Sequence, residues 1–491
     1  MSASQGEQGN AVAQYPKPLV LKFGGTSVED TPAVQRVVQI VKQRLRARPV
    51  VVVSALSGVT DQLLEAGRAA ARGGLEEGLR IVDELQQRHE HLAAGAVADR
   101  LRRCWQEQLE CDVEVLRKLL HAVSSSGSLT PRLQDHLLGL GESLSSKLLC
   151  AALESAGVSA AWVDACACVV TDAAHTRATP LWEETEAQVQ AAVLPCLAEG
   201  KVVVMGGFVG ATRDGIPTTL GRGGSDFSAS IVGASLHANR VEIWTDVDGI
   251  LTTDPKVCRD ARRVESMSFE EAADLAYFGA KVLHPSTIAP AMKKNIPVWV
   301  LNSRNPNCLG TEIVARPEED GCGVKALSMK KGIAVVDVEA VRWLAPELLR
   351  EVFEVFERHQ HSLDLLSANR GSLSLLVSST EALPSIAEEL RGLAHVRWEN
   401  HKALVCLVGE RVRRQPEVAA QVFRALQGVD LRMICQGASE RTISFLVDES
   451  KAEDALRRLH RVFFGSPVEH GADLSPAYPV CQAGSAWQEC D

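Results

Sequence analysis

The sequence lacks an excess of basic residues and long apolar segments. Its 52 Lys and Arg residues are outnumbered by 62 Asp and Glu residues, and the formal net charge is −10. Nucleic-acid-binding domains carry a basic patch or stripe, so no nucleic-acid partner is expected. No apolar run approaches the roughly 20 residues that span a bilayer. Residues 1–16 lack a basic region followed by an apolar one, so we expect no signal peptide, no membrane association and a short disordered tail.

Paired cysteines and the common nucleotide-binding fingerprints are missing as well. The 13 cysteines form no C-x-x-C pair, and the nearest two are Cys166 and Cys168. An odd count without regular spacing is typical of reduced thiols in a cytoplasmic protein, not of a disulfide framework. The sequence contains neither the Walker A pattern nor G-x-G-x-x-G. No residue is assigned as a metal ligand at this stage.

Six short apolar runs rich in β-branched residues recur in the first 320 residues, with helical stretches between them. Apolar runs without alternation are typical of strands buried on both faces. Helices between such strands form crossovers in a mainly parallel sheet. The sequence therefore predicts an α/β domain, an αβα sandwich over residues 17–320, with a helical excursion over residues 63–120. The predicted strands cover residues 18–23, 49–55, 160–165, 201–207, 240–246 and 296–302.

An internal repeat with an offset of 70 residues follows this domain. The run GSLSLLV, which ends at Val377, matches RTISFLV, which ends at Val447. Each copy has a strand–helix–strand–strand–helix pattern, and one such unit buries too little surface alone. We therefore expect two α+β modules, over residues 331–400 and 401–465, that pack together or against another subunit. Residues 466–491 have no periodicity and are expected to be irregular.

The stretch LVLKFGGTSVED, residues 19–30, brings a lysine to the end of the first predicted strand. Gly24 and Gly25 allow the backbone to approach a ligand closely. A following helix would direct unpaired N–H groups at an anion. Lys22 thus completes a candidate phosphate site, although a plain turn between strand and helix explains the same residues equally well.

A second glycine-rich loop, TTLGRGGSDFSAS, carries Arg222, Ser225 and Asp226. An arginine fork suits a carboxylate or a phosphate. An aspartate can hold lysines in position or bind a magnesium–phosphate complex. Helix capping by Ser225 or Asp226 is the simpler alternative. Functional groups concentrate on loops at strand ends, which favours a binding site here.

Further polar groups follow predicted strands or begin predicted helices. They are Thr60 in SALSGVT, Glu142 in GESLSS, Asp246 in WTDVDGILTTDPK and Lys281 in FGAKVLHP. Each has an ordinary structural explanation when taken alone: a turn, a helix-dipole contact for Glu142, or a solvated surface charge.

Taken together, these stretches resemble the amino-acid kinase family and, within it, the aspartate kinases. The motifs occur in the family's order, and the likeness extends from residue 17 to about residue 464; the repeat resembles the paired ACT modules of that family. The resemblance implies an ATP-dependent phosphotransferase that converts L-aspartate into 4-phospho-L-aspartate, the first step towards lysine, threonine, methionine and diaminopimelate. It also implies Mg²⁺ with ATP, an amino-acid effector, and a homodimer or larger homo-oligomer formed through the ACT modules. The matching motifs are KFGGTSV, SALSGVT, GESLSS, TLGRGGSDFSA, WTDVDGILTTDP and GAKVLHP.

The resemblance also implies roles for individual residues. The expected catalytic residues are Lys22, Asp226 and Lys281. The expected aspartate pocket consists of Thr60, Glu142, Arg222 and Ser225. The expected ATP contacts are Lys22, Gly24, Gly25, Thr245, Asp246, Leu251, Lys256, Lys281 and Val282. Relatives often carry tyrosine where Leu251 stands and arginine where Lys256 stands, so weaker adenine stacking is expected.

The effector site departs further from the family pattern. Asp364 matches an acid that lysine-sensitive relatives use to hold lysine. Arg370 stands where those relatives tend to carry glutamate, and it would repel a cationic effector. We therefore expect feedback by an amino acid without assigning which one.

Two alternatives remain at this stage. The first is another kinase of the same fold, such as a glutamate 5-kinase or a uridylate kinase. Glu142 and Arg222 argue for an amino-acid substrate, because one offers an anion and the other a cation. The second is a catalytically inactive amino-acid sensor that uses its ACT pair. The presence of Lys22, Asp226 and Lys281 argues against a sensor.

Overall fold

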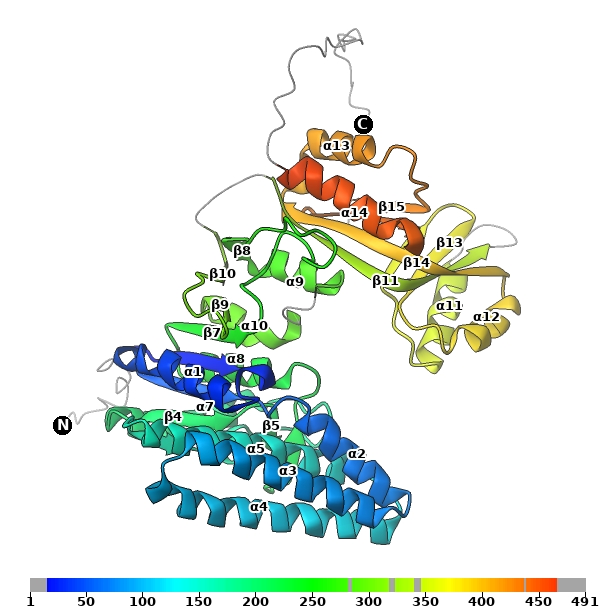
Figure 1. The fold of residues 1–491 in the computed structure, drawn as a ribbon. Helices are drawn as coiled ribbons and strands as arrows, with labels where there is room; N and C mark the ends of the chain where they lie inside the picture. Colours follow the sequence, from blue (N-terminus) through cyan, green and yellow to red (C-terminus); the bar gives the residue numbers. More distant parts are fainter. Residues whose placement is uncertain (1–15, 281–284, 318–322, 340–345, 437–438, 466–491) are drawn as a thin grey trace, which may run out of the picture.

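The computed structural model describes residues 16–280, 285–317, 323–339, 346–436 and 439–465. An α/β domain with an eight-stranded sheet is followed by a region with a six-stranded antiparallel sheet (Figure 1). This confirms the predicted fold class. The terminal segments that were predicted to be irregular fall outside the described residues, apart from residue 16.

The eight-stranded sheet has the order β3-β4-β2-β1-β7-β9-β10-β8. Only β10 runs antiparallel to a neighbour, β9, and the other adjacent pairs are parallel. The six predicted strands are all present and occupy six adjacent positions, whereas β8 and β10 at one edge were not predicted. The bounds are β1 Leu19–Phe23, β2 Pro49–Val53, β3 Ala160–Trp162, β4 Val202–Gly206, β7 Arg240–Thr245, β8 Ser266–Ser268, β9 Val298–Asn302 and β10 Thr311–Val314.

Helices cover both faces of this sheet and form two hydrophobic cores. Successive residues of β1 alternate between the cores: Leu21 and Phe23 face one, and Val20 faces the other. The long α3 and α4 helices form an outer layer, as predicted for the helical excursion (Figure 1). The first face carries α1 Thr31–Lys42, α2 Val59–Ala71, α3 Leu75–Ala96, α4 Asp99–Ser126 and α5 Pro131–Ser155. The second carries α6 Ala165–Cys168, α7 Trp182–Ala198, α8 Gly224–Ser235, α9 Phe269–Tyr277 and α10 Pro285–Lys293.

Short elements connect these layers near the strand ends. They are the 3-10 helices η2 Gly25–Ser27 and η3 Leu45–Ala47 and the two-stranded ribbon of β5 Val209–Ala211 and β6 Pro217–Thr219.

The six-stranded sheet has the order β12-β13-β11-β14-β16-β15, with neighbours antiparallel. The repeat found in the sequence is visible in this order, because β13 and β16 flank the long central pair β11 and β14 symmetrically. The strands are β11 Gly323–Glu339, β12 Leu365–Ala368, β13 Ser372–Val377, β14 His395–Glu410, β15 Met433–Cys435 and β16 Thr442–Asp448. The helices are α11 Pro346–Arg358, α12 Leu383–Arg391, η4 Val412–Arg414, α13 Pro416–Ala425 and α14 Glu449–Phe464.

The central strands join the two repeats into one sheet. The first part of β11 pairs with the second half of β14, and the remainder pairs with the first half. β11 therefore runs through residue 331, where the first module was predicted to begin. Each repeat has its own core beneath its two helices. The other face of the sheet shares the second core of the α/β domain and lies next to α9 (Figure 1).

Candidate active site

The glycine-rich loops converge on one cavity of about 550 Å³. It lies at the carboxyl ends of β1, β2 and β4, where ligands bind in parallel α/β sheets. The predicted residues that line it come from four different segments of the chain. They are Lys22, Gly25, Thr60, Glu142, Arg222, Ser225 and Asp226.

Lys22 and Asp226 form an ion pair at the edge of this cavity. Lys22 Nζ lies 2.7 Å from a carboxylate oxygen of Asp226, and the two side chains are 11% and 16% exposed. Lys22 is the fourth residue of β1, and Asp226 lies in the first turn of α8. The ammonium group is thus fixed in position while it remains accessible from the cavity.

The glycine pair after β1 brings two loops into close contact. A Cβ atom at Gly25 would lie 2.8 Å from the carbonyl oxygen of Ala55 and 3.1 Å from the amide nitrogen of Ser57. Only glycine fits there without moving backbone. The N–H of Gly24 donates to the carbonyl of Trp244 at 3.2 Å, so it already has a partner in the structure.

The helix expected directly after the glycine pair is only the short turn η2. The longer helix α1 begins at Thr31, where the Asp30 side chain accepts a hydrogen bond from the N–H of Ala33 at 2.7 Å. Asp30 caps one N–H group of α1, whereas the N-cap of η2, Gly24, makes no side-chain cap hydrogen bond among the described residues, so the expectation that N–H groups after Gly25 face an anion stays a prediction.

The second glycine loop turns sharply before α8. Gly221 and Gly223 have φ values of +77° and +71°, a region that favours glycine. Gly223 is the N-cap of α8, and no side chain of the described residues caps this helix. The alternative that Ser225 or Asp226 is a cap is therefore wrong. Both lie in the first turn and line the cavity instead.

Glu142 lies in the middle of α5 and not at a helix start. The helix-dipole explanation is therefore wrong. The residue is 3% exposed, and burial raises the pKa of its carboxyl to about 8. Within the part of the chain that the structure describes, its Oε2 atom has no hydrogen-bond partner. Backbone hydrogen bonds from Ala55 and Glu142 reach this carboxyl, and its remaining oxygen beside the cavity is suited to a cationic ligand group.

The residues predicted to contact ATP lie mostly outside this cavity. Thr245 ends β7, which is adjacent to β1, and exposed Asp246 follows it. Leu251 pairs with Arg263 in an isolated bridge, and the N–H of Lys256 donates to Asp254 at 2.8 Å. Of these groups, Thr245 and Asp246 follow the strand whose Trp244 carbonyl accepts from the N–H of Gly24.

Two further predicted residues, Lys281 and Val282, lie outside the described residues. Their roles as a second cation and as an ATP contact therefore stay predictions.

Asp135 supports the cavity wall and was missed by sequence reasoning. It is fully buried and accepts hydrogen bonds from Thr219 Oγ1 at 2.6 Å and from the N–H of Thr176 at 2.9 Å. Its carboxylate also lies 2.7 Å from Nδ1 of His175. Thr176 and Thr219 line the cavity, and Thr176 has a φ of +70°. No motif connects these positions in the sequence.

Asp364, the predicted effector residue, lies at the junction with the first repeat. Its Oδ1 atom pairs with Lys330 at 2.6 Å, and its Oδ2 accepts from the Ser378 hydroxyl. The Tyr277 hydroxyl, from α9, donates to its main-chain carbonyl. The carboxylate therefore already has a cationic partner within the chain.

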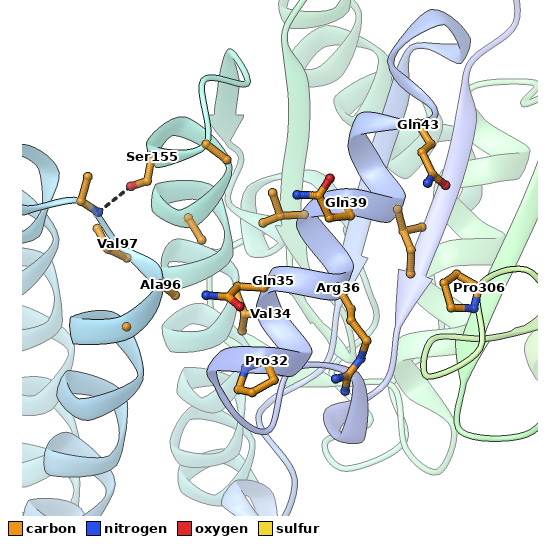
Figure 2. Close-up of a pocket in the computed structure, with 16 residues that line it drawn as sticks. Pro32, Val34, Gln35, Arg36, Gln39, Gln43, Ala96, Val97, Ser155 and Pro306 are labelled. Carbon is orange, nitrogen blue, oxygen red and sulfur yellow. Dashed lines mark hydrogen bonds between the residues drawn. The ribbon is translucent and has the colours of Figure 1, made fainter.

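A larger pocket of about 830 Å³ lies elsewhere, between α1, the end of α3 and α5. Figure 2 shows glutamine side chains along α1 and a hydrogen bond from the N–H of Ala98 to Ser155 Oγ, at 2.9 Å. Among the described residues that line this pocket, only Arg36 is ionisable. The pocket lacks the converging charges of the smaller cavity.

Comparison with known proteins identifies relatives of the whole chain. Residues 17–302 match the amino acid kinase family, and residues 405–463 match an ACT domain. Lysine-sensitive aspartokinase 3 of Escherichia coli K12 is 35% identical over 457 residues, which cover 91% of this chain and 99% of that protein. The chloroplastic aspartokinase 2 of Arabidopsis thaliana is 33% identical, with 91% and 84% covered.

Solved structures show the same relationship. The crystal structure of E. coli aspartokinase III in complex with aspartate and ADP, in the R-state, has a TM-score of 0.79 and 34% identity, and the match covers 91% of this chain and all of that one. The T-state structure of aspartokinase III with lysine and aspartate has a TM-score of 0.77 and 35% identity, with 91% and 99% covered.

Proposed function

The chain belongs to the amino acid kinase family, and we propose that it is an aspartate kinase, which transfers the γ-phosphoryl group of ATP to the β-carboxylate of L-aspartate. The observation that carries this proposal is the cavity in which the Lys22–Asp226 pair, the buried Glu142 and Arg222 meet. The product, 4-phospho-L-aspartate, would enter the synthesis of lysine, threonine, methionine and diaminopimelate.

Aspartate has three charged groups, and the cavity offers a complement to each. Arg222 would bind the α-carboxylate through its planar fork. Glu142 would bind the α-ammonium group, which would supply the partner that its Oε2 atom lacks among the described residues. Thr60 and Ser225 would complete the pocket. The β-carboxylate is then left to face Lys22.

Phosphoryl transfer in this site needs positioning and charge neutralisation more than proton transfer. An oxygen of the β-carboxylate would form a bond to the γ-phosphorus while the bond from that phosphorus to the β–γ bridging oxygen breaks, and ADP leaves. The attacking carboxylate is ionised at neutral pH, so no general base is required. Lys22 would stabilise the charge on the transferred group, Asp226 would orient Lys22, and Lys281 would supply a second cation.

The nucleotide would lie along the sheet edge beside β1 and β7. Gly24 and Gly25 would allow the phosphates to approach, and Thr245, Asp246 and Leu251 would contact the nucleoside side. Lys256 and Val282 are proposed as further ATP contacts.

We also propose that Mg²⁺ accompanies ATP. Mg²⁺ usually binds through one or two carboxylates and the substrate phosphates. The cavity offers Asp226 as a carboxylate, and among the described residues no cluster of three metal-ligating side chains occurs there. The residues present therefore fit an ion that arrives with the phosphates. Such an ion would neutralise phosphate charge.

Regulation and assembly are part of the proposal. An amino-acid effector would bind at the ACT modules, and its binding near Asp364 would compete with the Lys330 pair. Homodimers would form through the ACT region, because the edge strands β12 and β15 expose Leu366 and Ile434.

The helices of the described ranges are too short or too polar to span a membrane. None of them combines the length and the apolar character needed to cross a bilayer. The cytoplasmic location inferred from the cysteine pattern stays a prediction.

One assay separates the main proposal from its alternatives. The protein is supplied with ATP, Mg²⁺ and hydroxylamine, and the hydroxamate formed from the acyl phosphate is measured with aspartate or glutamate. A parallel assay measures ADP release with UMP. Aspartate hydroxamate alone supports the proposal. Turnover with glutamate or UMP identifies a different kinase, and no turnover with any acceptor supports the sensor.

A further inference from the structure

A cysteine, an aspartate and a histidine meet where the kinase domain contacts the second repeat. Cys258 and Asp260 lie in the loop between β7 and β8, and His460 lies on α14. One ligand atom from each lies within 4.8 Å of the others. Cys258 is 4% exposed and His460 is 1% exposed, whereas Asp260 faces solvent. The cluster is separate from the catalytic cavity.

These three side chains offer sulfur, nitrogen and oxygen, the donor set of Zn²⁺. Mg²⁺ and Ca²⁺ favour sites built from oxygen alone. A thiolate and a carboxylate together neutralise a divalent cation, and the neutral imidazole adds a third bond. A water on the exposed side would complete a tetrahedron. We propose that Cys258, Asp260 and His460 bind one Zn²⁺ ion that connects the kinase domain to α14.

The orientation of the histidine ring supports this assignment. His460 Nε2 lies 3.0 Å from Thr252 Oγ1, and this hydroxyl oxygen accepts a hydrogen bond from the N–H of Arg262. The other ring nitrogen, Nδ1, faces Asp260 Oδ2 at 3.5 Å. Two ligands of a tetrahedral zinc ion are about 3.3–3.6 Å apart. A hydrogen bond that fixes one ring nitrogen while the other faces the ion is the usual arrangement of a zinc-bound histidine.

Backbone contacts hold the loop in place. The N–H of Cys258 donates to the carbonyl of Asp254 at 3.0 Å, and the N–H of Ala261 donates to the carbonyl of Cys258 at 3.1 Å. Arg457 on α14 donates through Nε to the carbonyl of Val257 at 3.2 Å. The ligands are therefore positioned without large loop movement.

The protonation states set the pH dependence of binding. Burial raises the pKa of Cys258, and Asp260 adds to this while Arg457 opposes it. Burial lowers the pKa of His460, with Asp260 acting against this and Arg262 in the same direction. Zinc binds a thiolate and a neutral imidazole, so its affinity should fall as the pH is lowered.

In the experiment, the full chain is treated with a chelator to remove bound metal, and the chelator is then removed. ZnCl₂ is titrated in competition with a chromophoric chelator, and bound zinc is counted by mass spectrometry. We expect one zinc per chain. Cys258→Ser and His460→Gln should each weaken binding at least about 100-fold, and Thr252→Val about 10–100-fold. Cobalt(II) should show a thiolate charge-transfer band that Cys258→Ser removes.

Two further variants test the zinc site by binding alone, without a measurement of enzyme activity. Cys150→Ser removes a buried thiol elsewhere, on α5, and should bind zinc as the unaltered chain does. Asp260→Asn changes an exposed side chain, so it should fold normally and still lose affinity at least about tenfold. The proposal is overturned if the unaltered chain retains no stoichiometric zinc, or if Cys258→Ser and Asp260→Asn bind it with unchanged affinity.

Discussion

Two lysine–aspartate pairs in this molecule have nearly the same length. Lys22 and Asp226 are 2.7 Å apart beside the cavity, and Lys330 and Asp364 are 2.6 Å apart at the junction with the first repeat. Both aspartate side chains are about equally buried, at 16% and 15% exposure. Distance and burial therefore do not distinguish a catalytic pair from a structural one.

The two ion pairs differ in how completely the polar groups around them are paired. Asp364 uses both carboxylate oxygens and its main-chain carbonyl within the protein. Lys22, by contrast, faces a cavity that also contains the Glu142 carboxyl oxygen, which lacks a partner among the described residues. A site whose polar groups are incompletely paired can still form hydrogen bonds and ion pairs with a ligand. A fully paired junction instead holds two parts of the chain together.

The largest effect is expected from Lys22→Ala. Loss of the ammonium group removes charge stabilisation in the transition state, so kcat should fall at least about 10³-fold. Steady-state kinetics measure this, and circular dichroism checks the fold. Lys330→Ala is the matched control and should keep kcat within a few-fold. Near-normal turnover of Lys22→Ala would remove this lysine from the mechanism.

Arg222→Lys is expected to have the next largest effect. Lysine keeps the charge but cannot form two parallel hydrogen bonds to the α-carboxylate. The KM for aspartate should rise about 10–100-fold, with a smaller change in the KM for ATP. Arg213→Lys, which changes an exposed ion pair with Glu184, is the control and should change neither the KM for aspartate nor the KM for ATP. An equal rise in both KM values would contradict the assignment to aspartate.

Glu142→Gln should change the pH dependence of stability in the ligand-free protein. The folded pKa of about 8 exceeds the ordinary value of 4.5, so the folded state holds an extra proton between these values. The stability that this proton contributes is therefore fully present below about pH 4.5. It falls as the pH rises towards 8, by at most about 1.4 kcal/mol per pH unit. Denaturant unfolding across this range should show a shallower slope in Glu142→Gln. Identical slopes would mean that Glu142 is ionised in the folded protein.

Lys330→Met should have the smallest effect on catalysis. It leaves the Asp364 carboxylate without its cation, so the free energy of unfolding should fall by about 1–2 kcal/mol. The value of kcat should change less than twofold, because the pair lies outside the cavity. Thermal unfolding and steady-state kinetics measure both quantities, and Lys331→Met, in an exposed pair with Glu453, is the control. A large loss of kcat would show that the junction pair acts on the active site.

Local patterns predicted much of this architecture. The β-branched runs identified six of the eight strands of this sheet, since a strand buried on both faces needs apolar side chains throughout. The offset of 70 residues identified the two repeats. The resemblance to the amino-acid kinase family implied one site for Lys22, Arg222 and Asp226, and the structure brings these three together around one cavity.

Other features depended on contacts between distant residues. Glu142 was expected at a helix start because Gly141 precedes it, but α5 continues through both. Asp135 carries no local signal, because its three partners come from the loop after β3 and from β6. Neither β8, with the residues SMS, nor β10, with the residues TEIV, carries a continuous apolar run. The cluster of Cys258, Asp260 and His460 has no recognisable spacing, because His460 comes from α14, far along the chain from the other two.

By itself, the sequence determined the order of the elements, the repeat and the set of groups available for chemistry. Those properties follow from local periodicity and from the residue types at strand ends. Only the tertiary structure decided which groups are paired. Lys22 and Lys330 are alike as residues, and so are Asp226 and Asp364, but packing left one pair beside a cavity and enclosed the other in a complete hydrogen-bonded junction. The number of partners that a group has arises from segments distant in the chain, and it separates the two pairs although their aspartates are about equally buried.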